Sequence, residues 1–390
     1  MNIILFDNKK RNHLLPLTFT RPIASLRVGI LTIAEKWAKY LSVDKVSFFT
    51  EPYLQPKYGY RIAEKNLLID GSVCPNPNLI NSILSLNTNE CLVNDDVLIA
   101  ICLDEYGVEQ FIENRLNKLT KQYFSHKVIR IQYPEDLFSF NDEELRNDFN
   151  LLTNGRTSAN ISSTNTILGD SFFAEEGAEA ECSTFNTRTG PIYLGHHASV
   201  LEGSHIRGSF ALCNHSQVKM GAKIYGATTI GPHSRVGGEI TNSIIIGFSN
   251  KGHDGYLGNS VLGEWCNIGA DSNNSNLKNN YAEVRIWDYE HRAFRKTGLQ
   301  FCGLVMGDHA KCAINTMFNT GTVVGIAANV FGGGFPRNFV PDFSWGGAHG
   351  FEIHTLEKMF ETAQKVFERR EMIFDETEKD ILREVFERTR

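Results

Sequence analysis

A short segment of the chain carries residues whose types and spacing could support general-base catalysis. It reads Lys251-Gly-His-Asp-Gly-Tyr-Leu-Gly-Asn, so a histidine stands between glycines, with a lysine before it and a tyrosine after it. Histidine side chains titrate near neutral pH, so His253 could remove a proton from a reacting amine, which typically contributes about 10²- to 10⁴-fold in rate. A histidine taken alone is usually a surface residue, and it is the local context that favours catalysis here.

Other side chains near this segment could hold a ligand that carries a phosphate. Arg235 and Lys251 could make charge-assisted hydrogen bonds to it, and arginine can do so in bidentate fashion. Asn267 and Asn276 could donate hydrogen bonds to a developing oxyanion. Two alternatives stay open, because Arg235 could pair with Glu239 and the asparagines could form a structural ladder or turns.

These residues belong to a stretch, from about residue 160 to about residue 346, that repeats every six residues. Eight aliphatic residues follow one another in unbroken steps of six: Leu194, Val200, Ile206, Leu212, Val218, Ile224, Ile230 and Val236. Small residues precede most of them by two positions, and the step returns at Leu262, Ile268, Met306, Cys312, Phe318, Val324 and Val330. With roughly three positions in ten aliphatic, eight consecutive matches arise by chance about once in ten thousand.

The six-residue step predicts a parallel β-helix. Each six-residue piece forms one side of a triangular coil and sends one aliphatic side chain inward, and stacked coils bury a continuous column. Five histidines are expected to be solvated on the outer faces of ordinary coils: His196, His197, His205, His215 and His233. Residues 247–256 and 271–303 interrupt the repeat, and ligand-binding groups are usually displayed at such interruptions.

The motifs around His253 resemble a known enzyme family. The segment with His253 is followed by Cys266-Asn-Ile-Gly-Ala-Asp and by Asn274-Ser-Asn. Together they resemble the acetyltransferase half of the bifunctional N-acetylglucosamine-1-phosphate uridylyltransferase / glucosamine-1-phosphate N-acetyltransferase family, which carries His-x-x-Tyr-Leu-Gly-Asp, then Asn-Ile-Gly-Ala-Gly, then an asparagine-bearing loop. The likeness spans roughly residues 231–334. It implies a left-handed β-helix, a homotrimer, and acetyl transfer from acetyl-CoA to glucosamine 1-phosphate.

The resemblance also implies roles for single residues. His253 is similar to the general base, Tyr256 and Asn267 are similar to sugar contacts, and Arg235 is similar to the phosphate-binding arginine. Asn276, or its neighbour Asn274, resembles the asparagine that positions the amino sugar, and Ala270 resembles a coenzyme A contact. Lys251 is our own addition to the phosphate-binding residues. The chain departs from the family pattern at Asp271, where a glycine is usual, and at the cysteines and asparagines of residues 302–320.

Residues 1–150 alternate short apolar strands, at 2–7, 45–50, 66–70, 91–103 and 127–133, with helical stretches at 23–41 and 108–119. Such alternation predicts a Rossmann-like α/β domain with a mostly parallel sheet. Leu15-Pro-Leu-Thr-Phe-Thr-Arg-Pro resembles a pattern of nucleotide-sugar pyrophosphorylases, and Leu92-Val-Asn-Asp-Asp resembles their strand that ends in a metal-binding aspartate. Four residues are therefore candidates for nucleotide binding: Arg11, Arg21, Arg27 and Asp96.

The pyrophosphorylase likeness is incomplete. After the first predicted strand come Asp7-Asn-Lys-Lys-Arg-Asn-His, without the glycines that let a backbone approach a triphosphate. The domain is also short, so we expect a truncated nucleotidyltransferase. Mg²⁺ and UTP are expected only if this domain is active.

Composition limits the remaining possibilities. A net charge of −6 gives no basic field for nucleic acid or anionic lipid. Eight cysteines occur without a Cys-x-x-Cys pair, the first residues do not resemble a signal peptide, and no run of 18 apolar residues occurs. We therefore expect a cytoplasmic protein with reduced thiols and no nucleic-acid or membrane partner. No ligand spacing supports a metal site in the β-helix.

The sequence thus predicts three parts: an α/β nucleotidyltransferase-like domain at 1–150, a left-handed β-helix acyltransferase domain at 151–346, and a helical appendage at 347–390. The helical appendage is predicted from an amphipathic stripe, for which we expect only a packing role: Leu356, Met359, Phe360, Ala363, Val366 and Phe367. The favoured function is acetyl-CoA-dependent N-acetylation of an amino-sugar phosphate, within the synthesis of UDP-N-acetylglucosamine and cell-envelope precursors. A sugar-1-phosphate nucleotidyltransferase with a structural β-helix and a non-catalytic sugar-nucleotide-binding regulator are the alternatives.

Overall fold

The computed structural model describes residues 2–116 and 119–390, and its internal contacts divide the chain into two units. Unit 1 comprises Met1–Leu14, Thr20–Leu26 and Leu31–Gln132. Unit 2 comprises Leu15–Phe19, Arg27–Ile30 and Tyr133–Arg390. The helix expected at 108–119 includes residues 117 and 118, which lie outside the described residues.

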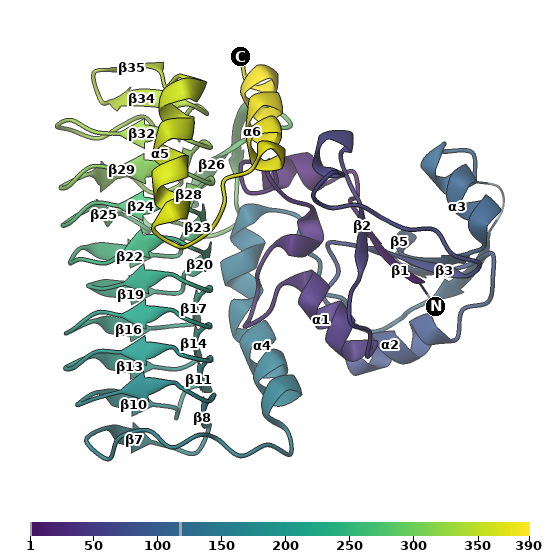
Figure 1. The fold of residues 1–390 in the computed structure, drawn as a ribbon, viewed down its shortest axis with the longest axis horizontal. Coiled ribbons are helices and arrows are strands. Elements are labelled where there is room, and N and C mark those ends of the chain that lie inside the picture. Colours follow the sequence, from purple (N-terminus) through teal and green to yellow (C-terminus); the bar gives the residue numbers. More distant parts are fainter. Residues whose placement is uncertain (1, 117–118) are drawn as a thin grey trace. The chain divides into compact units, whose positions relative to one another are not determined.

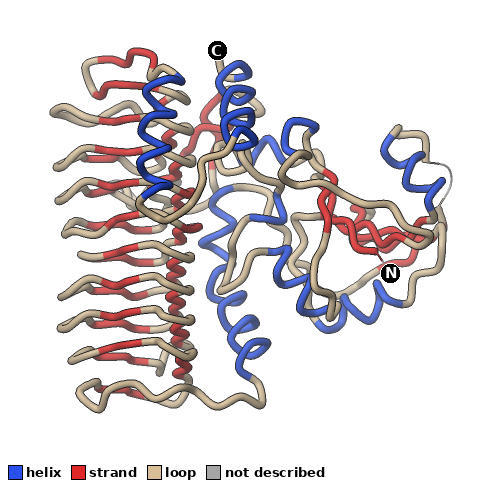
Figure 2. Tube along the Cα trace, viewed as in Figure 1, coloured by secondary structure: helices blue, strands red, loops and turns tan. Residues whose placement is uncertain are grey.

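Unit 1 is built on a six-stranded sheet in the order β2-β1-β3-β5-β4-β6 (Figures 1 and 2). The strands are β1 (Asn2–Phe6), β2 (Ser47–Phe49), β3 (Asn66–Asp70), β4 (Glu90–Asn94), β5 (Val97–Leu103) and β6 (Thr120–Tyr123). β1 is parallel to β2 and β3, and β4 is parallel to β6, whereas β5 is antiparallel to β3 and β4. The predicted α/β domain is confirmed, with a mixed sheet.

The antiparallel strand has a local cause that the hydrophobic pattern conceals. The single strand expected at 91–103 is a hairpin, and its turn residues Asp95 and Asp96 both have positive φ. Short hairpin turns of this kind favour aspartate, asparagine and glycine, because these residues tolerate that conformation. The strand expected at 127–133 does not form, and in that stretch only Arg130 makes an isolated bridge, to Val73.

Three α-helices accompany the sheet of unit 1: α1 (Ile33–Tyr40), α2 (Pro77–Leu84) and α3 (Glu105–Ile112). Each begins after a polar residue whose side chain accepts a hydrogen bond from a first-turn N–H, namely Thr32, Asn76 and Asp104. The helix expected at 23–41 is therefore split. Its first part is a single 3₁₀ turn, Ile23–Ser25, and the α-helix starts only after Thr32.

Unit 2 is a parallel β-helix whose faces are stacks of short strands (Figure 1). The first face contains β7 (Thr166–Leu168), β10 (Thr184–Asn186), β13 (His205–Arg207), β16 (Lys223–Tyr225), β19 (Glu239–Thr241) and β22 (Tyr256–Gly258). The second contains β8 (Phe172–Ala174), β11 (Ile192–Leu194), β14 (Phe210–Leu212), β17 (Thr228–Ile230), β20 (Ile244–Gly247), β23 (Val261–Glu264), β28 (Leu304–Met306), β31 (Thr322–Val324) and β33 (Phe339–Val340).

The third face contains β9 (Glu179–Ala180), β12 (Ser199–Val200), β15 (Gln217–Val218), β18 (Arg235–Val236), β21 (Asn250–Lys251), β24 (Asn267–Ile268), β29 (Lys311–Cys312), β32 (Asn329–Val330), β34 (Ser344–Gly347) and β35 (Gly350–Ile353). β35 pairs antiparallel with β34 and ends this sheet. A separate parallel pair joins β25 (Asn273–Asn274) to β30 (Met317–Phe318). The left-handed sense of the coil stays an expectation from the resemblance.

The interior of the β-helix is filled by the aliphatic residues that recur every six positions in the sequence. All eight residues of the unbroken series, and the seven at which the step returns, belong to one buried cluster. Burial of each such side chain contributes roughly 1.5–3 kcal/mol. Small residues fill the corners, where Ala198 and Ser204 are fully buried and the Ser204 hydroxyl donates to the backbone oxygens of Leu201 and Lys219. The predicted β-helix is confirmed.

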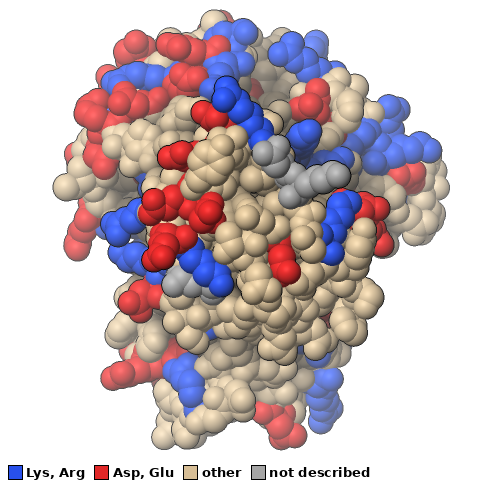
Figure 3. All heavy atoms as spheres, turned by 90° about the vertical axis from the view of Figure 1, so that its right-hand side faces the viewer, with Lys and Arg blue, Asp and Glu red and all other residues tan. Residues whose placement is uncertain are grey.

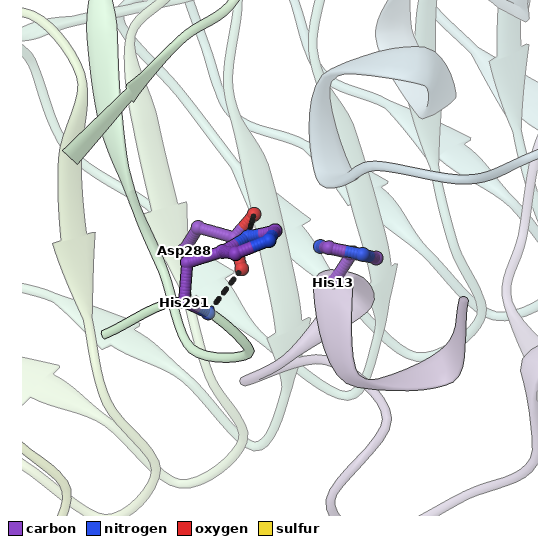
Figure 4. Close-up of side chains that lie close together, drawn as sticks. All are labelled: His13, Asp288 and His291. Atoms are coloured by element: carbon purple, nitrogen blue, oxygen red, sulfur yellow. Dashed lines mark hydrogen bonds and ion pairs between the residues drawn. The ribbon is translucent and has the colours of Figure 1, made fainter. Parts of the chain in front are cut away.

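The longer interruption of the repeat folds on the β-helix as an antiparallel hairpin, β26 (Arg285–Asp288) and β27 (Ala293–Lys296). Its turn is closed by Asp288, which accepts from the backbone N–H of Glu290 and whose carboxylate lies 3.3 Å from Nδ1 of His291 (Figure 4). Arg295 makes a bidentate pair with Glu135, at 2.5 and 2.7 Å. This pair ties the hairpin to α4 (Pro134–Thr153), the helix that precedes the coil.

Two helices follow the coil, α5 (Leu356–Glu368) and α6 (Glu376–Arg388). α5 runs along the β-helix (Figure 1) and buries Met359, Ala363 and Phe367 of the predicted stripe. Among the described residues, none of the helices is both long enough and apolar enough to cross a membrane. On the face drawn in Figure 3, acidic and basic side chains are interspersed.

Candidate functional site

A pocket of about 710 Å³ lies on the third face of the β-helix, where α5 adjoins it. It brings together four residues singled out from the sequence, Arg235 on β18, His253, Asn267 on β24, and Ala270. They come from successive coils, because residues at the same point of neighbouring turns stack above one another. The first interruption of the repeat therefore opens into a pocket.

The His253 side chain is exposed, on a tight loop between β21 and β22. The loop is held against the next coil, because the carbonyl oxygen of Asp254 accepts from the N–H of Asp271 at 3.0 Å. Gly255 has φ +112°, and a Cβ there would lie 2.2 Å from the carbonyl oxygen of Ser272. Only glycine fits this close approach of two backbones. Asp271 also has positive φ, which explains why glycine is usual at that position.

The pocket is lined by more cations than the sequence indicates. Besides Arg235, its lining includes Lys219, Lys311, Arg369 and Arg370, and none of the described lining residues is acidic. The neighbour that could have neutralised Arg235, Glu239, instead accepts from the Tyr225 hydroxyl at 2.6 Å. An uncompensated positive cluster of this kind favours an anionic ligand.

The charges of this cluster act on one another. Burial, together with the nearby charges of Arg235 and Arg369, lowers the pKa of Arg370, whose Nη2 donates to Asn250 at 3.4 Å. Burial lowers the pKa of Lys311 to about 8, and its Nζ donates to the carbonyl oxygen of His309 at 2.9 Å. A bound phosphate would relieve the repulsion that Arg235 and Arg369 exert on Arg370.

A column of stacked rings along one corner of the coil seats α5 beside the pocket. Successive centroids lie 5.2 Å apart for His197 and His215, 4.9 Å for His215 and His233, 4.9 Å for His233 and Phe248, 4.5 Å for Phe248 and Trp265, and 4.0 Å for Trp265 and Phe367 of α5. His233, expected to be solvated, is half-buried, and burial lowers its pKa. The C-terminal end of α5 thus brings the two residues that follow it, Arg369 and Arg370, to the pocket, beyond the packing role expected of this helix.

Three other predicted residues do not line this pocket. Tyr256 and Asn276 form a pair of their own, in which the asparagine Nδ2 donates to the tyrosine hydroxyl at 3.0 Å and to Asn259 at 2.8 Å. Asn274 lies inside the coil, where its side chain accepts from the N–H of Gly258 at 2.9 Å and donates to the carbonyl oxygen of the same residue at 3.1 Å. Asn274 therefore has the contacts of a ladder residue.

Lys251 also lies inside the coil. Its side chain is buried, and its ammonium group donates to the carbonyl oxygens of His253 at 2.5 Å and of Asp254 at 3.2 Å. Burial lowers the pKa of Lys251 to about 8. The pocket lining described above does not include it.

Unit 1 has a smaller pocket, of about 290 Å³, at the carboxyl ends of the parallel strands β1 and β2. Such ends are the usual ligand-binding edge of an α/β sheet. Arg11 is part of its lining and pairs with Asp7 at 2.9 Å. Arg21 is buried outside the lining, and Nη2 of this side chain lies 3.4 Å from the Thr20 hydroxyl.

The two remaining nucleotide-binding candidates lie elsewhere. Asp96 stands on the exposed turn between β4 and β5 and pairs with Lys121 at 2.8 Å. Arg27 belongs to unit 2, where its side chain is buried and donates to the carbonyl oxygens of Ile30 and, at 3.3 Å, of Ile246. Neither residue lines the pocket of unit 1.

Two aspartates at the same sheet edge were not singled out from the sequence. Asp7 follows β1, and Asp70 ends β3, where it pairs with Arg130 at 3.1 Å and accepts from Asn8 at 2.7 Å. Burial raises the pKa of both carboxyl groups, against the neighbouring arginines and hydrogen bonds. Their position at the ends of predicted strands 2–7 and 66–70 was a signal that could have identified them.

Comparisons with known proteins place parts of this chain beside sugar-nucleotide enzymes. Residues 3–157 match the model of a family described as sugar nucleotidyl transferase. The chain is similar to two proteins named bifunctional protein GlmU. It is 31% identical over 87 residues to that of Methanocaldococcus jannaschii and 33% identical over 89 residues to that of Methanococcus aeolicus. Each match covers 22% of this chain, and 21% and 20% of the respective relative.

The family resemblance inferred from the motifs is therefore confirmed. The family model covers the N-terminal domain, the two relatives carry the name of a bifunctional protein, and the chain has a parallel β-helix. Because the chain spans only about a fifth of each relative's length, the similarity supports a role in sugar-nucleotide metabolism as a transferase.

Proposed function

We propose that this chain, whose N-terminal domain matches the sugar nucleotidyl transferases, transfers the acetyl group of acetyl-CoA to the amine of an amino-sugar phosphate, with glucosamine 1-phosphate favoured. The observation that carries the proposal is the pocket in which His253 adjoins a cluster of cations, with no acidic side chain among the described lining residues. Both substrates carry phosphates, and both would be attracted to that cluster.

In this reaction the substrate amine attacks the thioester carbonyl, a C–N bond forms, and the C–S bond breaks. His253 removes the proton that the amine loses, and this proton passes to the departing thiolate. Asn267, exposed in the pocket, supplies an N–H donor for the developing oxyanion. Arg235 and Arg370 bind phosphate through charge-assisted hydrogen bonds, and Ala270 adjoins the acyl donor.

The family resemblance supports two further features of the proposal, a homotrimer and a cytoplasmic location. Tyr256 and Asn276 do not line the pocket of their own chain. In a trimer they could contact a ligand bound in the pocket of a neighbouring subunit. Sedimentation equilibrium measures this assembly state directly.

The acceptor is tested by measuring thiol release from acetyl-CoA with glucosamine 1-phosphate, glucosamine 6-phosphate, galactosamine 1-phosphate and glucosamine. We expect a phosphorylated amino sugar to give a kcat/KM at least about tenfold higher than glucosamine, because a hydrogen bond to a charged group contributes roughly 1.5–3 kcal/mol. Equal kcat/KM values for all four acceptors would show that the cations of the pocket do not bind the phosphate of the acceptor. Binding without any turnover would favour the non-catalytic regulator.

A second candidate activity is uridylyl transfer from UTP to a sugar 1-phosphate by unit 1. It is supported by the match of residues 3–157 and by the pocket at the carboxyl ends of β1 and β2. The carboxyl groups of Asp7 and Asp70 are engaged by Arg11 and Arg130, so they form no open site for Mg²⁺ and no step is assigned to the ion.

Pyrophosphate release from UTP, N-acetylglucosamine 1-phosphate and Mg²⁺ tests this second activity. Lys9→Met removes an exposed cation of the pocket without orphaning Asp7, and we expect it to raise KM for UTP at least about tenfold, through loss of a charged hydrogen bond. Lys45→Met, an exposed lysine outside the lining, is the matched control. If wild-type protein releases no pyrophosphate, unit 1 is not a nucleotidyltransferase for these substrates.

A further inference from the structure

One of the inward positions of the β-helix is occupied by a lysine. On the third face, Val218 pairs in register with Val236, and Val236 pairs in register with Lys251. The adjacent strand places Ile268 next in the same column, and Cys312 follows it. An aliphatic side chain is the rule at this position, so Lys251 replaces one in the interior of the coil.

A buried ammonium group is costly unless hydrogen bonds replace its lost hydration. The side chain of Lys251 is only 1% exposed, and its carboxylate neighbours Asp254 and Asp271 are themselves exposed. Its hydrogen bonds go to two consecutive backbone carbonyls, those of His253 and Asp254. These carbonyls belong to the loop that carries the proposed base.

Fixing these two carbonyls fixes the loop. The orientation of the peptide group that follows His253 sets the ψ angle of that residue and, with it, the direction of its side chain. The glycines on either side leave the loop free to adopt many conformations, so a restraint has to come from elsewhere. Backbone bonds from the Asp271 N–H to the Asp254 oxygen and from the Glu239 N–H to the Gly255 oxygen restrain the end of the loop. Lys251 adds two side-chain bonds, one of them to the carbonyl oxygen of His253 itself.

We propose that Lys251 is a positioning residue, which holds the 252–255 loop from inside the β-helix and so directs His253 into the pocket. This assignment rests on the proposed acetyl transfer for its catalytic consequence. We therefore assign Lys251 this role and not a contact with the sugar phosphate, because its ammonium group is bonded to the loop backbone and the residue does not line the pocket.

The two roles predict opposite kinetics for Lys251→Met, which keeps a chain of similar length and removes the donors. A positioning residue is expected to lower kcat at least about tenfold and to change KM for glucosamine 1-phosphate less than about threefold, because a misplaced base slows the chemical step. A phosphate ligand would raise KM with kcat retained, and that result would overturn the proposal. Val218→Met places the same side chain in the same inward column, away from the loop, and is expected to leave both constants nearly unchanged.

Amide hydrogen exchange of residues 252–256 gives a readout that does not depend on acetyl transfer. We expect the hydrogens of these amides to exchange at least about tenfold faster in Lys251→Met than in wild type, while the amides of the neighbouring strands keep their exchange rates. Unchanged exchange in the loop would overturn the proposal even in an active enzyme. If wild type transfers no acetyl group, the proposed function fails while this experiment still tests the lysine. Lys251→Gln, which keeps one N–H donor, is used if the methionine variant does not fold, and it should exchange faster than wild type too.

Discussion

Replacing His253 with alanine is expected to lower kcat for acetyl transfer by about 10²- to 10⁴-fold, the usual contribution of a positioned general base. The side chain is exposed in the pocket and the loop is held by backbone bonds, so truncation should leave the fold intact. KM for both substrates should change little, since the cations that bind phosphate remain. Steady-state rates of thiol release measure both constants.

His205→Ala is the matched control for this variant. His205 is also an exposed histidine of the β-helix, on β13 of the first face, and it does not line the pocket. Its removal should leave kcat within about twofold of wild type, because exposed substitutions away from a site have small effects. Equal activity of His253→Ala and His205→Ala would refute the role of His253 as the base.

Removing two arginines of the pocket is expected to have the second large effect. The double variant Arg235→Met, Arg370→Met should raise KM for a phosphorylated substrate about 100-fold or more, because each charged hydrogen bond contributes roughly 1.5–3 kcal/mol. kcat should fall much less, since these contacts are made in both the ground state and the transition state. The wild-type KM should also rise with ionic strength, and the variant should have lost most of that dependence.

Two arginines of α6 provide the control for this double variant. Arg383 pairs with Asp380 and Glu376, and Arg388 pairs with Glu384, so both are compensated by acidic partners outside the pocket. The variant Arg383→Met, Arg388→Met removes the same net charge. If both double variants raised KM equally, the effect would come from the net charge and not from the pocket.

The β-helix was predictable because its information is local. Each coil repeats the same small set of demands, an aliphatic residue inward and a small residue at the corner, so eight successive matches identify the fold. The interruption that carries His253 could be recognised for the same reason, as a break in a regular series. The structure brings His253 to Arg235 and Asn267 because equivalent points of neighbouring coils stack.

What could not be predicted depends on contacts between residues far apart in the sequence. The arginines after the α5 stripe look like ordinary surface charge, and contacts such as the stack of Phe367 on Trp265 bring Arg370 to the pocket. The break in the repeat hid the inward direction of Lys251, because the step of six is lost between Val236 and this residue. In unit 1, the direction of β5 followed from a two-residue turn rather than from hydrophobicity.

We propose that the pocket on the third face transfers an acetyl group to an amino-sugar phosphate. Mass spectrometry of glucosamine 1-phosphate after incubation with acetyl-CoA and wild-type protein tests it most directly. We expect a product heavier by one acetyl group, formed on the nitrogen, and almost none with His253→Ala. Recovery of unchanged glucosamine 1-phosphate with fully folded wild-type protein, across the range of neutral pH, would contradict it.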